Sequence, residues 1–256
     1  MVTATLSKTV VAVVACFTFL IFGSSKKYSR AKTGTVNIGF LNSVAGLPLI
    51  FDSTRYTNPF GETYRVSRLK YYISNVTLSG NKHTFSEPDS YHLIDAADNS
   101  SLVFSFETDI NNYSAISFMI GVDSIKNVSG AQSGALDPAK GMFWTWNSGY
   151  IFFKLEGNSP QSTIINQKVE YHIGGFSGSN NALQTITLPL TAGNMVTIKE
   201  GKATDIIIAA DINKLWQGNM DLKITSNPAT MTPGLLAKDI AGNYSDMFSI
   251  KSVTNH

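Results

Sequence analysis

Apolar and polar residues alternate along several short segments of this chain, and turn residues separate the segments roughly every 10 to 15 residues. A period of two places every second side chain on the same face of an extended backbone, so such segments are predicted to be β-strands. The clearest ones are segments 36–40, 66–78 and 183–190. The pattern predicts an all-β fold, an antiparallel β-sandwich with one or two short helices. Those helices are expected after an Asp211 cap and between Leu235 and Phe248.

The only cysteine, Cys16, lies near the N-terminus, so the folded domain is expected to have no disulfide and no thiolate site. Charged residues make up 15% of the chain, against about 25% in typical globular domains. Gly, Ser, Asn and Thr take their place, a composition typical of extracytoplasmic β-proteins. The net charge is +2, and no basic cluster stands out beyond Lys26-Lys27. A nucleic-acid partner, which would require a basic stripe, is therefore not expected.

Residues 1–25 are predicted to form a signal peptide. Lys8 precedes an apolar run, Thr9–Phe22, which is shorter than the roughly 20 residues that a membrane-spanning helix needs. Gly23-Ser24-Ser25 then offers small residues for cleavage. Export to the periplasm, the cell surface or the medium is therefore expected.

A second interpretation of this region stays open. Val13-Val14-Ala15-Cys16 resembles a bacterial lipobox, and a lipid on Cys16 would tether the protein to a membrane. The residues that follow, Phe17–Phe22, stay apolar, which favours ordinary cleavage near Ser25. We then expect a flexible tail over residues 26–34 and one β-sandwich domain over residues 35–256.

Two of the three tryptophans lie in the stretch Gly130–Gly157. Met142, Trp144 and Trp146 alternate with other residues, so in a strand they would share one face. Asn147–Gly149 breaks the pattern, and period-two alternation resumes from Ile151. We expect two long strands joined at this break. They form either a core hairpin, which is the favoured interpretation, or a ligand or metal site lined by tryptophan.

Motifs of common enzyme classes are missing from the sequence. In the glycine-rich region after Ile173, Gly175-Phe176-Ser177-Gly178-Ser179 misses the serine-hydrolase elbow G-x-S-x-G by one residue. The sequence has no H-E-x-x-H motif and no phosphate-binding loop before a helix. The carboxylates are scattered, with no pair that suggests acid and base roles. The protein is therefore not expected to be an enzyme.

Two of the four histidines, His92 and His172, follow tyrosines in separate predicted strands. Imidazole is a good ligand for copper, but a metal site needs ligands that converge in space. A lone histidine in a strand is more often a hydrogen-bonded structural residue. Both interpretations remain open at the level of sequence.

Several motifs together resemble the MbnP-like family, secreted β-proteins named from methanobactin operons and related to copper-repressible surface proteins of methane oxidisers. The similarity extends over about residues 36–250 and looks closest to versions from Bacteroidetes-type bacteria. Its most specific part is the stretch 129–150, which contains Gly141-Met142-Phe143-Trp144-Thr145-Trp146-Asn147-Ser148-Gly149-Tyr150, followed by Lys154-Leu155-Glu156-Gly157. The supporting segments are 66–75, 91–95, 120–123 and 171–175.

The resemblance implies a non-enzymatic copper-binding protein that serves copper acquisition or storage. In characterised relatives histidines hold the metal beside a tryptophan that a di-haem peroxidase-like partner oxidises. Here the candidate metal ligands are His92 and His172, with Met142 as a thioether ligand suited to Cu(I). Trp144 and Trp146 are the candidates for oxidation or for lining the site.

The chain departs from the family pattern in two places. Asn42 stands where relatives often have a histidine, and the C-terminal segment Lys251–His256 lacks their His-x-His-Asn sequence. Both departures remove imidazoles. The alternative function is therefore a metal-free module that binds a protein or glycan partner through its tryptophan-rich region. A hydrolase, the third hypothesis, has no support in the sequence.

Overall fold

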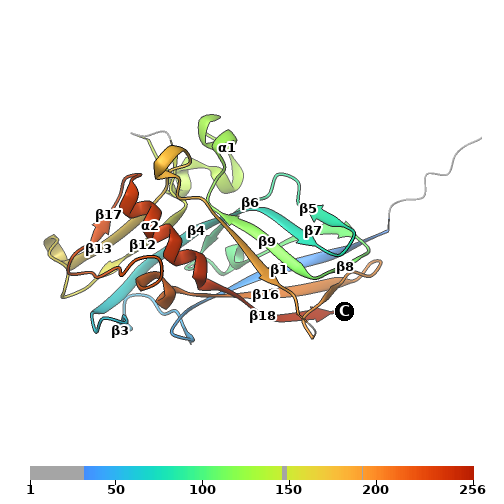
Figure 1. The fold of residues 1–256 in the computed structure, drawn as a ribbon, viewed down its shortest axis with the longest axis horizontal. Helices are drawn as coiled ribbons and strands as arrows, with labels where there is room; N and C mark the ends of the chain where they lie inside the picture. The colour runs from blue at the N-terminus through green and yellow to red at the C-terminus, as the bar shows by residue number, and fades with distance from the viewer. Residues whose placement is uncertain (1–31, 146–148, 192) are drawn as a thin grey trace, which may run out of the picture. The chain divides into compact units, whose positions relative to one another are not determined.

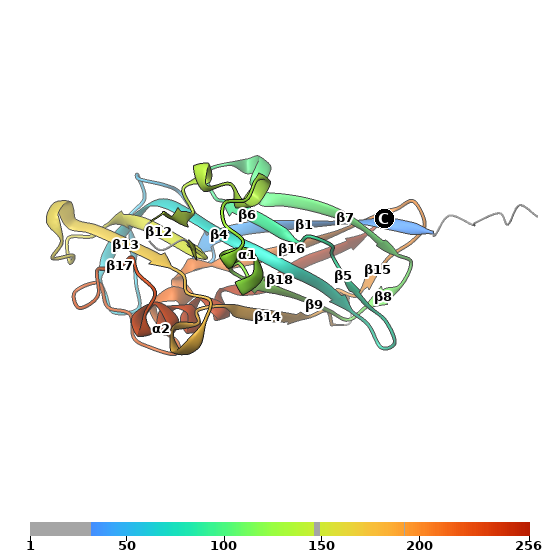
Figure 2. The same cartoon turned by 90° about the horizontal axis from the view of Figure 1, so that it is seen from above.

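The computed structural model describes residues 32–145, 149–191 and 193–256. Two curled sheets face each other across a shared core, as Figure 1 shows from the side and Figure 2 from above. This arrangement confirms the predicted β-sandwich with few helices. Among the described residues, none of the helices is long and apolar enough to span a bilayer.

The first sheet has five strands in the order β18-β16-β1-β2, and β7 pairs with the same edge of β1 as β2, nearer the start of that strand. Its strands are β1 (Thr33–Val44), β2 (Leu47–Pro48), β7 (Val103–Asp109), β16 (Ala203–Asp211) and β18 (Phe248–Asn255). The first strand begins at Thr33, two residues before the predicted start of the domain. Lys32, just before it, forms a 2.8 Å ion pair with Glu200.

The second sheet has nine strands in the order β14-β9-β4-β12-β13-β17, with β3, β5 and β6 also paired to β4. The strands are β3 (Tyr56–Thr57), β4 (Thr63–Ser79), β5 (Thr84–Ser86), β6 (Tyr91–Asp95), β9 (Ala115–Ile120), β12 (Phe153–Asn158), β13 (Lys168–Ile173), β14 (Gln184–Pro189) and β17 (Ala229–Thr230). Two further pairs are β8 (Asn112–Tyr113) with β15 (Val196–Thr197), and β10 (Phe143–Trp144) with β11 (Gly149–Tyr150).

One pairing differs from the antiparallel expectation. Strands β1 and β16 run parallel and are in register at nine positions, from Thr35↔Ala203 to Ser43↔Asp211. Parallel neighbours require a long crossover connection. Here that connection contains every strand of the second sheet except β17, which follows β16 in the chain. A short parallel pair, β13 with β17, also occurs.

The core between the sheets is strongly aromatic. Phe40 of β1 contacts Tyr71, Phe118 and Phe248, with ring centroids 6.0, 6.1 and 6.5 Å away and all three rings edge-on. Edge-to-face contacts of this kind add to the free energy gained from burying apolar area. Because these rings come from four strands in both sheets, the cluster joins the two layers.

Two α-helices accompany the sheets, α1 (Ser124–Val128) and α2 (Leu235–Tyr244). Helix α2 closes one end of the core with Ile240, Ala241 and Tyr244, all fully buried. The predicted Asp211 cap is confirmed, since its carboxylate accepts from Asn213 N at 3.0 Å. Short 3₁₀ turns complete the chain at Asn99–Leu102, Gly134–Leu136, Pro138–Lys140, Ile165–Gln167, Gly178–Asn180, Ile212–Trp216 and Ser245–Met247.

The tryptophan-rich stretch does not form two long strands. Strands β10 and β11 have two residues each, and residues 146–148 between them lie outside the described residues. Ile151, Phe152 and Phe153 are all buried in succession, so the predicted alternation is wrong there. The reason is that both faces are covered. The other sheet and α2 cover the inner face, and the segment from α1 to residue 141 covers the outer face, where Tyr72 Oη donates to Ala135 O.

Candidate functional site

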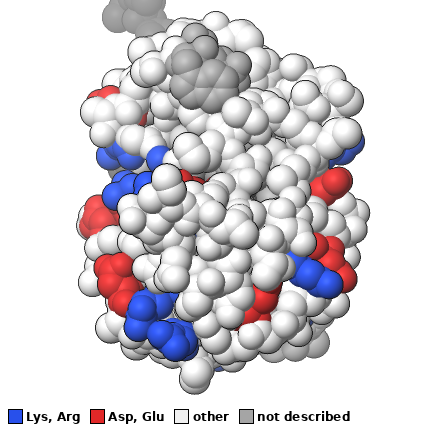
Figure 3. Space-filling model, turned by 90° about the vertical axis from the view of Figure 1, so that its left-hand side faces the viewer, with Lys and Arg blue, Asp and Glu red and all other residues white. Residues whose placement is uncertain are grey.

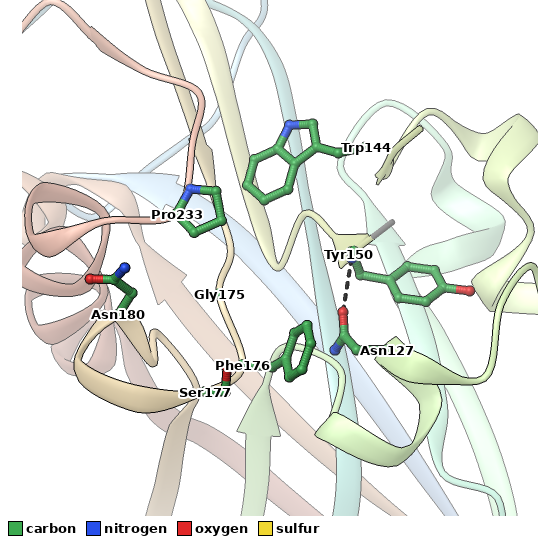
Figure 4. Close-up of a pocket in the computed structure, with 9 residues that line it drawn as sticks. Asn127, Trp144, Tyr150, Gly175, Phe176, Ser177, Asn180 and Pro233 are labelled. Carbon is green, nitrogen blue, oxygen red and sulfur yellow. Dashed lines mark hydrogen bonds between the residues drawn. The ribbon is translucent and has the colours of Figure 1, made fainter. Parts of the chain in front are cut away.

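A cavity of about 250 Å³ opens beside Trp144. Four parts of the chain form it: the β10–β11 hairpin, helix α1, the glycine-rich loop after β13 and the segment before α2. Figure 4 shows the ring of Trp144 on one side, Pro233 opposite and Phe176 below. The lining residues are Asn127, Trp144, Gly149, Tyr150, Gly175, Phe176, Ser177, Asn180 and Pro233. We call this cavity the Trp144 pocket.

The glycine-rich loop fits the pocket because it lacks side chains. A Cβ on Gly174 would lie 2.5 Å from Tyr150 O and 2.7 Å from the Trp144 ring, distances that no real contact reaches. Gly175 has φ +120°, which L-residues rarely adopt, and a Cβ there would lie 2.4 Å from Asn180 O. The run that the sequence offered as an imperfect hydrolase elbow therefore serves close packing against the tryptophan.

Asn127 holds the opposite wall and was not found from the sequence. Its side chain is buried in α1, and Oδ1 accepts from Tyr150 N at 2.9 Å. Its Nδ2 donates to the carbonyls of Val122 and Asp123. From sequence alone, an asparagine in so short a helix would be expected to face solvent. Only the tertiary structure shows that Asn127 links α1 to the hairpin.

The described lining of the Trp144 pocket is uncharged. None of its described lining residues carries an imidazole, ammonium or carboxylate group. Burial raises the pKa of Tyr150, and its neutral hydroxyl donates to Leu136 O at 2.8 Å. Aromatic rings beside amide and hydroxyl groups suit a neutral ligand with both an apolar face and hydrogen-bonding groups.

The end of the molecule that carries β13 and β17 is shown in Figure 3. Basic and acidic side chains are interspersed around its rim, and its centre is uncharged. This face therefore does not present a continuous basic stripe of the kind that binds a phosphate backbone.

His92, on β6, faces the space between the sheets. Its ring stacks on Phe104 of β7, with centroids 3.5 Å apart and planes 3° apart. Its Nε2 lies 2.9 Å from Glu87 Oε2. The imidazole therefore packs as a flat aromatic side chain whose polar edge is held by a carboxylate.

His172, on β13, lies on the outer face of the second sheet. Its Nε2 lies 2.8 Å from Glu156 Oε1, and its side chain is 12% exposed. This hydrogen bond holds the pKa of Glu156 below its usual value, and the nearby guanidinium of Arg68 has a smaller effect in the same direction. A carboxylate that orients an imidazole also occurs behind metal ligands, where it fixes the tautomer.

The strand register separates the two histidines. His92 pairs with Ile73, whereas His172 pairs with Lys154, which pairs with Lys70. Residues 70 and 73 of β4 are an odd number apart, so the histidines point to opposite faces of the sheet. Strands β4 and β12 also lie between them, a separation of about 14 Å at the usual strand spacing.

The other sequence candidates are equally dispersed. Met142 is fully buried and Trp144 is 6% exposed, while Trp146 lies outside the described residues. The structure brings Trp144 into the pocket but does not bring His92, His172 and Met142 together. In the described part of the chain, no three His, Cys, Asp or Glu side chains form a metal-binding group.

The two departures from the family pattern lie far apart on the first sheet. Asn42 accepts a 2.9 Å hydrogen bond from Tyr71 Oη and is paired with Ala210. His256, at the other end of β16, has its Nε2 2.9 Å from Asp205 Oδ2. Five residues of strand correspond to about 16 Å. Side chains at these two positions therefore lie at different ends of the sheet.

The two facing sheets and the Trp144 pocket define a β-sandwich protein with one small aromatic site. The model of the MbnP family matches residues 33–232. Because the match covers more than half of the chain, the protein belongs to the MbnP family, which confirms the resemblance in the sequence. The structure is similar to that of MbnP from Methylosinus trichosporium, with a TM-score of 0.51 and 13% identity over 88% of this chain and 99% of that one. At this identity the likeness shows the fold alone. No curated protein matches the chain.

Proposed function

We propose that this protein is an exported, non-enzymatic MbnP-family protein that binds a neutral group of a protein or glycan partner in the Trp144 pocket. One observation carries the proposal: Trp144, Tyr150 and Phe176 surround a cavity of about 250 Å³ whose described lining has no charged side chain. Without an acid, a base or a charged nucleophile, such a site is suited to binding rather than to catalysis. Ligand pockets usually measure about 300 to 1,000 Å³, so this one suits a single sugar ring or one side chain.

Tryptophan fluorescence, recorded against panels of neutral glycans and peptides, tests this proposal. A ligand in the pocket should change the emission of Trp144 and protect it from acrylamide. Phe176→Ala should weaken binding roughly tenfold or more, as expected for an aromatic anchor. Phe60→Ala is the matched control, since Phe60 is an equally half-buried ring outside the pocket. Equal binding by both variants would rule out the Trp144 pocket as the site.

Copper binding for acquisition or storage is the second candidate function. Family membership supports it, together with the His172 ring held by Glu156, an arrangement that suits a metal ligand. A titration with Cu(I) and Cu(II) should use the parent and the His92→Ala, His172→Ala and Met142→Leu variants. A loss of affinity in His172→Ala alone would identify a site on the outer face of the sheet. Tight binding that no variant alters would reject these ligands, and a parent without uptake would reject the copper function.

Export and the redox partner are proposals that follow from the leader and from the family. N-terminal sequencing of secreted protein should begin near Lys26, whereas a diacylated Cys16 would establish a lipoprotein.

A di-haem peroxidase-like partner would leave an oxidised tryptophan. Peptide mass spectrometry of protein isolated from its native source should then find the modification at Trp144 or Trp146.

A further inference from the structure

A second cavity, of about 210 Å³, lies between the Pro138–Lys140 turn and strands β4 and β12. Four of its lining residues are basic: Arg68, Lys70, Lys140 and Lys154. It shares no described lining residue with the Trp144 pocket.

The fold brings these cations together from three distant segments. Lys70 and Lys154 are direct register partners on β4 and β12, so their side chains share the outer face. Arg68 lies two residues earlier on the same face of β4, and Lys140 reaches the cavity from the turn above. The turn is held over the sheet because Lys154 Nζ donates to Gly141 O at 2.5 Å and Lys70 Nζ to Lys140 O at 3.4 Å.

Charge around the cavity is not balanced. Arg68 has Glu156 at 2.7 Å, and Lys70 has Asp95 at 2.8 Å. In the described ranges, neither Lys140 nor Lys154 has a carboxylate within ion-pair distance. In that part of the chain these two ammonium groups have no direct ion pair, and the carboxylates of Glu156 and Asp98 act on them only from a longer distance.

Lys154 is the most unusual of the four because it is only 7% exposed. An ammonium has three donors, and within the described residues Lys154 Nζ makes one hydrogen bond, to Gly141 O, which uses one of them. Burial lowers the pKa of Lys154, the nearby carboxylate of Glu156 raises it by a smaller amount, and the positive charges of Arg68 and Lys70 lower it further, so that the net pKa is lowered. A buried cation is costly unless a counter-charge accompanies it, so an anion in the cavity would stabilise it.

Side chains rather than backbone amides would recognise the anion. The N–H groups of Ala139, Lys140 and Gly141 already donate within the turn, at 2.9 to 3.0 Å. A guanidinium fork combined with ammonium groups is the donor set that matches tetrahedral oxyanions.

We propose that this cavity binds an oxyanion, a phosphate or sulfate group, which Arg68, Lys140 and Lys154 contact directly while Lys70 fixes the turn. The site is separate from the Trp144 pocket and does not depend on the function proposed for that pocket.

Calorimetric titration of the folded protein with sodium phosphate and sodium sulfate, at constant ionic strength set with chloride, tests the proposal. Saturable binding is expected. Arg68→Gln and Lys140→Gln should each weaken it roughly tenfold, as expected for a lost hydrogen bond between charged groups. Both residues are exposed, so the variants should remain folded. Lys168→Gln is the matched control, because it removes a positive charge from the same outer face away from the cavity.

A second readout separates a built site from general charge screening. Phosphate should raise the pKa of the Lys154 ammonium, followed by NMR of the side-chain nitrogen, in the parent but not in Arg68→Gln. Absence of saturation, or an equal loss in Lys168→Gln, would overturn the proposal. Sedimentation with phosphatidylglycerol vesicles, lost in Arg68→Gln and Lys140→Gln, would identify a lipid headgroup as the anion. Saturable binding of free phosphate without sedimentation would support the site with a soluble ligand.

Discussion

Glu62 shows how a single buried carboxylate can organise a loop. It is 6% exposed and accepts hydrogen bonds from Asn58 Nδ2, Ile224 N, Thr225 N and Thr225 Oγ1 at 2.7 to 2.9 Å. Burial on its own raises the pKa of Glu62, but these bonds together outweigh it and the net pKa is lowered. The ionised form therefore stabilises the junction between the turn before β4 and residues 224–225.

Glu62→Gln is expected to lower the free energy of unfolding at pH 7 by about 2 to 4 kcal/mol, since an amide offers one acceptor oxygen to donors that now share two. Because the folded pKa is depressed, the stability from Glu62 is complete above its unfolded value and is lost as the pH falls below about 4.5. The variant should therefore lose less stability on acidification than the parent. Urea unfolding at several pH values measures both effects.

The exposed carboxylate of Glu107 provides the control for this experiment. Glu107→Gln should change the free energy of unfolding by no more than about 0.5 kcal/mol. If the free energy of unfolding fell equally steeply on acidification in the parent and in Glu62→Gln, the role given to the buried carboxylate would be contradicted.

At the scale of elements, β4 is the strand on which the second sheet is built. It spans Thr63–Ser79 and pairs with β12 and β9 on one side and with β6 and β5 on the other. The register with β12 shifts between Glu156 and Gly157, a bulge that bends the pair. Gly157 approaches the neighbouring backbone so closely that a Cβ would lie 1.9 Å from Arg65 O.

Gly157→Ala is expected to lower the free energy of unfolding by about 1 to 3 kcal/mol, because strand backbone must move to accept the methyl group. The melting temperature should fall accordingly in calorimetry. Gly234→Ala is the matched control, since nothing lies within 4 Å of its Cβ position and its backbone is extended. A Gly157→Ala protein as stable as the control would show that the bulge relaxes freely.

At the scale of the whole molecule, the sandwich extends beyond the segment that the family model matches. That match ends at residue 232, whereas α2 and β18 follow it. Strand β18 pairs with β16 along most of its length, and Phe248 belongs to the aromatic cluster around Phe40. The physical domain therefore continues to the last strand.

A chain that ends at residue 232 is therefore expected not to fold. It would expose the edge of β16 and leave the end of the core, which Ile240 and Tyr244 cover, open to water. Far-UV circular dichroism and thermal unfolding should show no cooperative transition. A chain that ends at Asn255 should melt close to the parent, because it loses only the exposed contact of His256 with Asp205 and the terminal hydrogen bond from His256 N to Ala203 O. A cooperative transition in the shorter chain would refute the domain boundary.

Local sequence predicted those features that depend on residues a few positions apart. Ile186 and Leu188 are buried as their alternation implies, and Asp211 caps its turn. The helix expected from Leu235 begins there and ends at Tyr244 before a 3₁₀ turn. Trp144 was likewise predicted as part of the core or of a site, and it is both buried and beside a pocket.

What the sequence determined by itself was the strand content, the caps and the family, because period-two alternation and capping side chains act over a few residues. Only the tertiary structure decided which strands are neighbours. Register put His92 and His172 on opposite faces, made β1 and β16 parallel, and gathered Lys70, Lys140 and Lys154 around one cavity. Pairing across more than a hundred residues depends on how the whole core packs, and no local pattern encodes it.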